Sequence, residues 1–320
     1  MHPRSLSIVI EWENAALTGA SRARRMLAEL WHQLAEAAPR LTGVPEIVIP
    51  FDPNAVAEPM LAAMVAAVGR GAPEAATVRL IAGTEPADYY QQKNAGAQAC
   101  SGEIVIFLDS DVVPEPGWLA GLLDALAHEP DAVVSGNTYV DVDGWYARAF
   151  AMFWFFPLRE EAGRLADNHW FFANNVAFPR AQIRAHPFPR LESFRGQCAV
   201  LAQELRANGQ RILLQPASRV AHSVPRGLYH FVARALCHGH DETRLPQLYG
   251  PASAKAGLKR LSRDLRGAAT RIRSRRRPLG ASRATAIGAG VLAGLYFTLK
   301  CVGYLISLRN PGFIKRRLPI

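Results

Sequence analysis

Residues 103–116 have the sequence EIVIFLDSDVVPEP, which is the clearest strand signal in the chain. The apolar run IVIFL predicts a buried strand, and this strand leads directly into Asp109 and Asp111. Burying two unpaired carboxylates is costly, so the turn requires a cation or solvent. Carboxylates at this spacing are oxygen ligands of the kind that Mg²⁺ or Mn²⁺ prefers. The alternative is that the turn only caps a helix beginning near Trp118.

The sequence upstream of this strand alternates between strand and helix patterns. Three apolar runs predict strands, at residues 6–10, 46–51 and 77–82. Helical patterns separate them, and such alternation is typical of an α/β fold with a Rossmann-like, mostly parallel central sheet. Ligands bind such sheets at the carboxyl ends of the strands. Asp52 directly follows the second predicted strand, at the end where ligands bind.

The downstream half also contains strand and helix patterns. Helices are expected at residues 118–127 and 198–207, and strands at residues 133–139, 171–178, 211–214 and 218–221. The aromatic stretch FAMFWFF, residues 150–156, either dips into a membrane interface or packs beneath a loop.

The net charge of +10 is unevenly distributed along the 320 residues. Residues 255–283 hold 11 basic residues and one acidic residue, and residues 300–317 add five basic residues. Residues 1–254 therefore carry a net charge of −5, so the basicity belongs to the C-terminal part. An acidic N-terminal region argues against nucleic-acid binding. The basic stretch, with leucines interleaved, predicts an amphipathic helix lying on anionic membrane lipids.

Residues 286–308 form a hydrophobic segment whose only charge is Lys300. Its length of 23 residues is enough to span a hydrocarbon core of roughly 30 Å. A spanning helix, a re-entrant or interfacial helix, and a packed soluble helix are all compatible with this composition. The four cysteines lack zinc-site or disulfide-framework spacing, so reduced thiols are expected.

Residues 92–119, QKNAGAQACSGEIVIFLDSDVVPEPGWL, closely resemble family 2 glycosyltransferases of the GT-A fold. The matching positions are Asn94, Gly96, Gly102, Asp109, Asp111, Pro114, Trp118 and Leu119. The resemblance implies a hexosyltransferase that uses a nucleotide-sugar donor, a UDP- or GDP-sugar. It further implies a lipid-linked or cell-surface polysaccharide acceptor and Mg²⁺ or Mn²⁺ as cofactor.

Four regions are expected along such a chain. They are a GT-A domain at 1–235, a basic amphipathic region at 236–283, a hydrophobic, membrane-associated helix at 284–308 and a basic tail at 309–320. No signal-peptide pattern precedes the first strand. We therefore expect the protein at the cell inner membrane, with the catalytic domain on its cytoplasmic face.

The resemblance assigns the metal site to two acidic residues and a histidine. Asp109 and Asp111 would flank the donor diphosphate, with Asp111 as the direct metal ligand. His222, near the end of a strand, would complete the metal site as a neutral imidazole. The alternative is a structural strand-end histidine.

The resemblance also places three residues against the donor. Asp52 would hydrogen-bond the base, and Lys93 and Asn94 would contact the donor. The alternatives are a strand-end turn for Asp52 and a solvated helix face for Lys93. The first strand departs from the family, since residues 11–14 are EWEN where PTYN-like residues are usual. This leaves the identity of the donor base open.

The acceptor side shows a larger departure. Inverting members carry a Glu-Asp pair whose Asp is the general base, but this chain has Gln197 and Cys198. Glu192 is the candidate catalytic base; the alternatives are a retaining reaction and an acceptor that needs no protein base. The missing carboxylate also allows a catalytically weak relative that binds nucleotide sugar or scaffolds a membrane glycan-assembly complex.

The cluster CHGHDE, residues 237–242, groups further polar side chains. One Cys and two His at this spacing do not make a four-ligand zinc site. We expect a loop that closes over the donor phosphates, or a surface turn, with His240 and Asp241 as the candidates to touch the donor.

Overall fold

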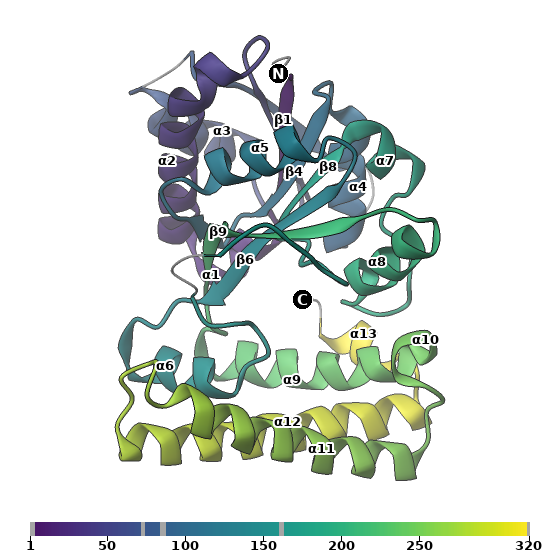
Figure 1. Ribbon diagram of the computed structural model, residues 1–320. Helices are drawn as coiled ribbons and strands as arrows, with labels where there is room; N and C mark the ends of the chain where they lie inside the picture. The colour runs from purple at the N-terminus through teal and green to yellow at the C-terminus, as the bar shows by residue number, and fades with distance from the viewer. Residues whose placement is uncertain (1–3, 72–73, 84–87, 160–162, 319–320) are drawn as a thin grey trace. The chain divides into compact units, whose positions relative to one another are not determined.

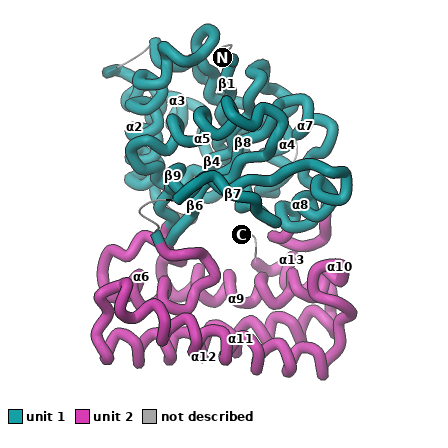
Figure 2. The backbone as a smooth tube through the Cα atoms, viewed as in Figure 1, with its two compact units in different colours: residues 1–139, 159–190, 197–222 teal, residues 140–158, 191–196, 223–320 magenta. Residues whose placement is uncertain are grey.

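The computed structural model describes residues 4–71, 74–83, 88–159 and 163–318. The chain divides into two compact units, which Figure 2 draws in different colours. Unit 1 comprises residues 1–139, 159–190 and 197–222, and unit 2 comprises residues 140–158, 191–196 and 223–320. The chain therefore passes between the units several times.

Unit 1 is built around one mixed sheet, and some of its strands are labelled in Figure 1. The parallel part runs in the order β3 (Thr77–Ala82), β2 (Glu46–Phe51), β1 (Leu6–Glu11) and β4 (Ile104–Asp109). The order continues with β8 (Asn175–Pro179), β6 (Val133–Val140), β9 (Ile212–His222) and β5 (Val112–Pro114), while β7 (Ala166–Asp167) pairs with β9. The α/β class is confirmed. The expected parallel arrangement holds for the first four strands, whereas β8 joins β4 antiparallel.

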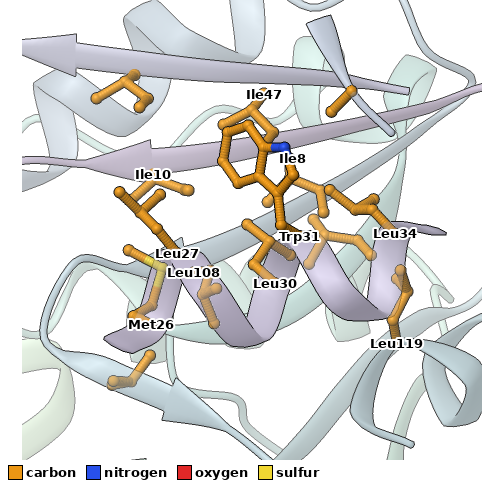
Figure 3. Close-up of a cluster of buried hydrophobic side chains, with 14 of the residues drawn as sticks. Ile8, Ile10, Met26, Leu27, Leu30, Trp31, Leu34, Ile47, Leu108 and Leu119 are labelled. Carbon is orange, nitrogen blue, oxygen red and sulfur yellow. The ribbon is translucent and has the colours of Figure 1, made fainter. Parts of the chain in front are cut away.

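The central strands are buried on both faces because successive residues point into two different hydrophobic clusters. In β1, Ile8 and Ile10 belong to one cluster and Val9 to the other. Figure 3 shows Leu30 and Trp31 of α2 packed against the first cluster. The helices that pack on the first cluster are α2 (Ala20–Ala37), α3 (Glu58–Gly69) and α5 (Trp118–His128). Those on the second are α4 (Tyr89–Ala99), α7 (Arg180–Ala185) and α8 (Gln197–Ala207).

Two short elements complete unit 1, and two strand predictions need correction. The short elements are α1 (Glu13–Thr18) and a 3₁₀ turn at Ala38–Arg40. The two strands expected at 211–214 and 218–221 are replaced by the single strand β9, which begins at Ile212. Pro216 falls between the residues of β9 that pair with β7 and those that pair with β5, so its missing N–H does not end the strand. The strand expected at 171–178 is confined to β8.

Gly102 allows β1 and β4 to approach each other, and a side chain there is expected to destabilise unit 1. A Cβ atom on Gly102 would lie 2.6 Å from the backbone carbonyl carbon of Leu6 and from the backbone nitrogen of Ser7. We expect Gly102→Ala to lower the free energy of unfolding by about 1–3 kcal/mol, as overpacking typically does. Gly71→Ala is the matched control, because nothing lies within 4 Å of its added Cβ. Equal urea midpoints for the two variants would contradict this prediction.

Unit 2 is helical. Its helices are α6 (Gly144–Phe153), α9 (Gly227–Arg244), α10 (Pro246–Tyr249), α11 (Ala254–Arg275), α12 (Arg283–Arg309) and α13 (Phe313–Arg317). α12 packs against both α9 and α11, as Figure 1 shows. A Cβ on Gly239 would lie 1.9 Å from the Lys300 carbonyl oxygen, so the backbones of α9 and α12 are in close contact. The last two residues of the expected basic tail, 319–320, lie outside the described residues.

α12 is the one helix among the described residues that is long and apolar enough to cross a bilayer. Length and composition alone do not separate a spanning helix from a packed one. In its most apolar window, 44% of the residues are buried inside the protein, so packing accounts for part of its apolar character.

Candidate active site

Three acidic side chains lie at the carboxyl ends of two neighbouring strands in unit 1. Glu11 ends β1 and Asp109 ends β4, and the parallel register places these residues opposite each other. Asp111 follows in the turn before β5. Glu11, Asp109 and Asp111 are exposed by only 0%, 3% and 4%. Buried like charges repel one another, so this site requires compensating cations or protons.

Asp109 is held by an internal network. The Lys93 ammonium nitrogen lies 2.6 Å from Asp109 Oδ1, and the Lys93 side chain is completely buried. The Tyr89 hydroxyl lies 2.8 and 2.9 Å from the two carboxylate oxygens, and the Asn14 amide donates to Oδ2 at 3.2 Å. Tyr89 and Lys93 are four residues apart on α4, so one helix face supplies both groups. The charge of Asp109 is therefore compensated within the protein.

Glu11 is a site residue that the sequence indicated only as a departure from the family pattern. Its oxygens accept from the Asn14 side-chain amide at 2.9 Å and from the Glu13 backbone N–H at 2.8 Å. Burial, followed by the negative charge of Asp109, raises the pKa of Glu11 well above its ordinary value. Burial and the neighbouring Asp109 therefore both disfavour the charged form of Glu11.

Asp111 and His222 come together across two paired strands. β5 pairs antiparallel with the end of β9, so that Val112 lies opposite His222. The His222 Nε2 atom lies 3.9 Å from Asp111 Oδ2. The Arg22 guanidinium donates to the backbone oxygens of Asp111 at 2.5 Å and of Ala221 at 2.6 Å, which ties the two strands to α2. The structure thus brings together the two residues predicted to bind the metal.

This pair fits a divalent cation that is shared with a phosphorylated ligand. Asp111 offers the carboxylate oxygen that Mg²⁺ and Mn²⁺ prefer, and a neutral imidazole is a common metal ligand. In the described part of the chain, no group of three or more His, Cys, Asp and Glu side chains is placed to hold a metal. Two protein ligands would leave the other coordination positions to phosphate oxygens and water.

The sequence of this region matches a known family. The model of glycosyl transferase family 2 matches residues 71–180, which include α4, β4 and the turn with Asp109 and Asp111. Residues 71–180 are a glycosyltransferase family 2 domain. The glucosyl-dolichyl phosphate glucuronosyltransferase of Haloferax volcanii is 25% identical over 179 residues, which cover 50% of this chain and 56% of that protein. The chain thus spans little more than half the length of this curated relative.

Two solved structures resemble the whole chain. Mannosyltransferase PcManGT from Pyrobaculum calidifontis, in complex with GDP-Man and Mn²⁺, gives a TM-score of 0.59 at 17% identity, covering 95% of this chain and 88% of that one. S. aureus TarS 1-349, in complex with UDP-GlcNAc, gives 0.51 at 11% identity, covering 96% and 92%. At these identities the likeness establishes the fold alone, and the expected GT-A fold is confirmed.

Asp52 and Asn94, which were both predicted to contact the donor, form hydrogen bonds with other residues of the protein. Asp52 follows β2, and its Oδ1 accepts from the backbone and side-chain nitrogens of Asn54 at 2.8 and 3.1 Å. The Asn94 amide donates to the Phe188 carbonyl at 2.8 Å and accepts from the Phe188 N–H at 3.0 Å. Asp52 therefore makes the strand-end turn that was the alternative for it, and Asn94 anchors a distant loop; donor contact stays a prediction for both.

No carboxylate begins α8 on the acceptor side. The helix starts at Gln197, so Gln197 and Cys198 occupy its first turn. The Tyr90 hydroxyl lies 3.5 Å from the Cys198 sulfur, and burial raises the pKa of the Cys198 thiol. A thiol with a raised pKa stays protonated near neutral pH, so it does not replace the missing general base.

Glu192, the candidate base, lies in the segment of unit 2 that precedes α8. It exposes 82% of its side chain, and its Oε2 lies 3.7 Å from Arg244 of α9. Its catalytic role stays a prediction.

The prediction of a loop or surface turn at CHGHDE was wrong, because residues 237–242 lie inside α9 and are mostly buried. The Asp241 carboxylate accepts from the backbone N–H groups of Phe194 and Arg195 at 2.7 and 3.1 Å. A His240 ring nitrogen lies 3.3 Å from the Glu192 carbonyl oxygen. Burial raises the pKa of Asp241 to about 7. These side chains hold the segment that carries Glu192, a function that local spacing does not reveal.

Proposed function

We propose that this protein is a glycosyltransferase that moves a sugar from a nucleotide-sugar donor to a lipid-linked or cell-surface glycan acceptor. The observation that carries the proposal is the approach of Asp111 and His222 to 3.9 Å beside the buried Asp109. A metal-diphosphate complex satisfies the ligand chemistry of this pair, and the family 2 domain contains both Asp109 and Asp111.

Each side chain of the site has a part in this reaction. Asp111 and His222 would hold Mg²⁺ or Mn²⁺, which when bound supplies positive charge against the nucleoside diphosphate as it leaves. Lys93 and Tyr89 hold the Asp109 carboxylate in a fixed, buried position. The acceptor hydroxyl attacks the anomeric carbon of the sugar, the bond to the diphosphate breaks, and the hydroxyl proton goes to a base. Glu192 is the side chain that we assign to this last step.

The choice of acceptor rests on the relatives and on unit 2. The Haloferax volcanii relative is named for glucosyl-dolichyl phosphate, which is a lipid-linked sugar. The basic helix α11 and the apolar helix α12 favour a site at an anionic membrane surface. We place the protein at the cytoplasmic face of the inner membrane, where nucleotide sugars are available.

A second candidate function follows from the first turn of α8. Gln197 and Cys198 offer no general base, so the chain could bind a nucleotide sugar without turning it over and serve within a membrane glycan-assembly complex. Donor binding is common to both candidates, and only turnover separates them.

A donor screen tests the proposal in two stages. The full chain is melted with UDP-sugars, GDP-sugars and the free nucleotides, each with MnCl₂ or with EDTA. One donor class is expected to raise the melting temperature in MnCl₂ but not in EDTA. A ligand at about 100 times its Kd stabilises the folded protein by about 2.7 kcal/mol. Nucleotide release with a polyprenyl phosphate or glycan acceptor then separates transfer from binding. Failure of every donor to shift the melting temperature would overturn both candidates.

A further inference from the structure

The helix α12 has its polar and apolar faces reversed relative to a surface helix of a soluble protein. Its side toward α9 and α11 contains the only charge between Arg283 and Arg309, that of Lys300. Its outward side carries Ile287, Val291 and Leu295, which are 71%, 68% and 47% exposed. Surface helices normally bury their apolar stripe and expose their charges.

The inward side of α12 is fixed by a buried ion cluster. The Lys300 ammonium nitrogen lies 2.8 Å from Glu242 of α9 and 2.6 Å from Asp264 of α11, and Lys300 is only 5% exposed. The hydroxyl of Ser307 lies 3.0 Å from a ring nitrogen of His240 on the same side. Rotating α12, or withdrawing it from α9 and α11, would leave buried charges without partners.

The outward side forms a continuous apolar strip. Ile287, Val291 and Leu295 follow one another at intervals of four residues, which places them on one helix face. Val302, 41% exposed, lies 15 residues after Ile287, close to the same face. Trp145 of α6 packs on Gly288 beside this strip and is itself 55% exposed. Tryptophan is enriched where proteins meet the interface of a bilayer.

The neighbouring helix α11 supplies the complementary charge. Its exposed side chains include five cations and two leucines: Lys255, Lys259, Arg263, Arg266, Arg273, Leu258 and Leu265. Cations beside an exposed apolar strip match the surface of an anionic bilayer, in which phosphate groups border the acyl chains.

We infer that α12 lies in the plane of an anionic membrane surface, with its outward strip in the interface, and does not cross the bilayer. Crossing would require α12 to separate from its buried ion partners and would bring Lys300 into hydrocarbon. This inference deepens the proposed function, because it rests on the membrane attachment proposed there, but its test does not use sugar transfer.

The test is flotation of the full chain with preformed vesicles of phosphatidylcholine, with and without 30% phosphatidylglycerol (about a third anionic lipid, to provide the negative surface). We expect wild-type protein to float with the anionic vesicles and Val291→Glu/Leu295→Glu to lose about 10-fold or more of its bound fraction. Met60→Glu is the matched control, because Met60 is an equally exposed apolar residue, at 58%, on α3 of unit 1. Lys259→Glu/Arg266→Glu should remove the preference for anionic lipid.

Two further measurements test the alternatives, which are a spanning α12 and a second copy of the chain packed on the strip. Epitope tags before Met1 and after Ile320 should be digested equally by protease added to inside-out membrane vesicles, since a surface helix leaves both ends on one side. Digestion of only one tag would overturn the inference in favour of a spanning helix. If the chain forms an oligomer without lipid and Val291→Glu/Leu295→Glu dissociates it, the strip is a contact with a second copy of the chain and the inference is overturned. Equal flotation of the variant and wild type would also overturn the inference.

The donor screen distinguishes a failure of the membrane inference from a failure of the proposed function. Val291→Glu/Leu295→Glu should retain the donor-dependent melting shift, because neither residue lies in unit 1. Flotation without any donor shift would leave the surface helix standing and the proposed function without support.

Discussion

Asp111→Asn is expected to lower sugar transfer by about 10³-fold or more, equivalent to roughly 4 kcal/mol of transition-state stabilisation. Asparagine keeps the shape of the side chain but removes the charge that would bind the cation beside His222. The fold should survive, because Asp111 is one of the negative charges that raise the pKa of the buried Glu11, and its loss relieves repulsion. We therefore expect an unchanged or higher melting temperature alongside the lost activity.

The matched control for this prediction is Asp124→Asn. Asp124 pairs with Arg40 on the surface, and 60% of its side chain is exposed. Its substitution should change neither turnover nor the Mn²⁺ concentration that gives half-maximal activity. If the turnover of Asp111→Asn stays within threefold of wild type (about 0.6 kcal/mol), Asp111 is not a metal ligand that the reaction requires.

Lys93→Met is expected to lower the free energy of unfolding by about 3–5 kcal/mol, the cost of breaking a buried ion pair from one side. Methionine fills a similar volume, so the loss reports the charge and not a cavity. Without the ammonium group, Asp109 stays buried opposite Glu11 with the Tyr89 and Asn14 hydrogen bonds but no paired cation among the described residues. Urea titration followed by tryptophan fluorescence measures the change.

A double variant distinguishes lost charge from lost packing. Lys93→Met/Asp109→Asn removes both buried charges, so it should recover much of the stability lost in Lys93→Met while remaining inactive. Lys259→Met, on the exposed side of α11, is the control and should change stability by less than about 0.5 kcal/mol. A double variant whose loss equals the sum of the two single losses would show that the pair is not coupled.

Most of the parallel half of the sheet could be predicted from local patterns. The apolar strand before Asp109 and the strands at 46–51 and 77–82 form where expected. Strands buried on both faces consist of short continuous apolar runs, and helices carry a periodic stripe, so a few neighbouring residues carry the information. The antiparallel half was harder to predict, because Pro216 interrupts the pattern of β9 without ending the strand.

The sequence identified most residues of the site, but it did not predict which contacts each of them makes. Asp111 and His222 were expected together and are close, whereas Lys93 was expected to face solvent or donor and is buried on Asp109. Tyr89 was not singled out, although its spacing of four residues from Lys93 places it on the same helix face. Arg22 had no local signal, since its partners lie 89 and 199 residues away in the chain.

The family motif, the α/β class and the separation of charge between an acidic N-terminal region and a basic C-terminal region can all be read from the amino-acid sequence. These properties depend on composition and on patterns within one strand or helix. The fold was needed to show that residues 237–242 are helical, that Glu11 joins the acidic cluster, and that Lys300 points inward on α12. Those outcomes depend on partners distant in sequence, because a buried charge adopts the position in which an opposite charge or a proton compensates it.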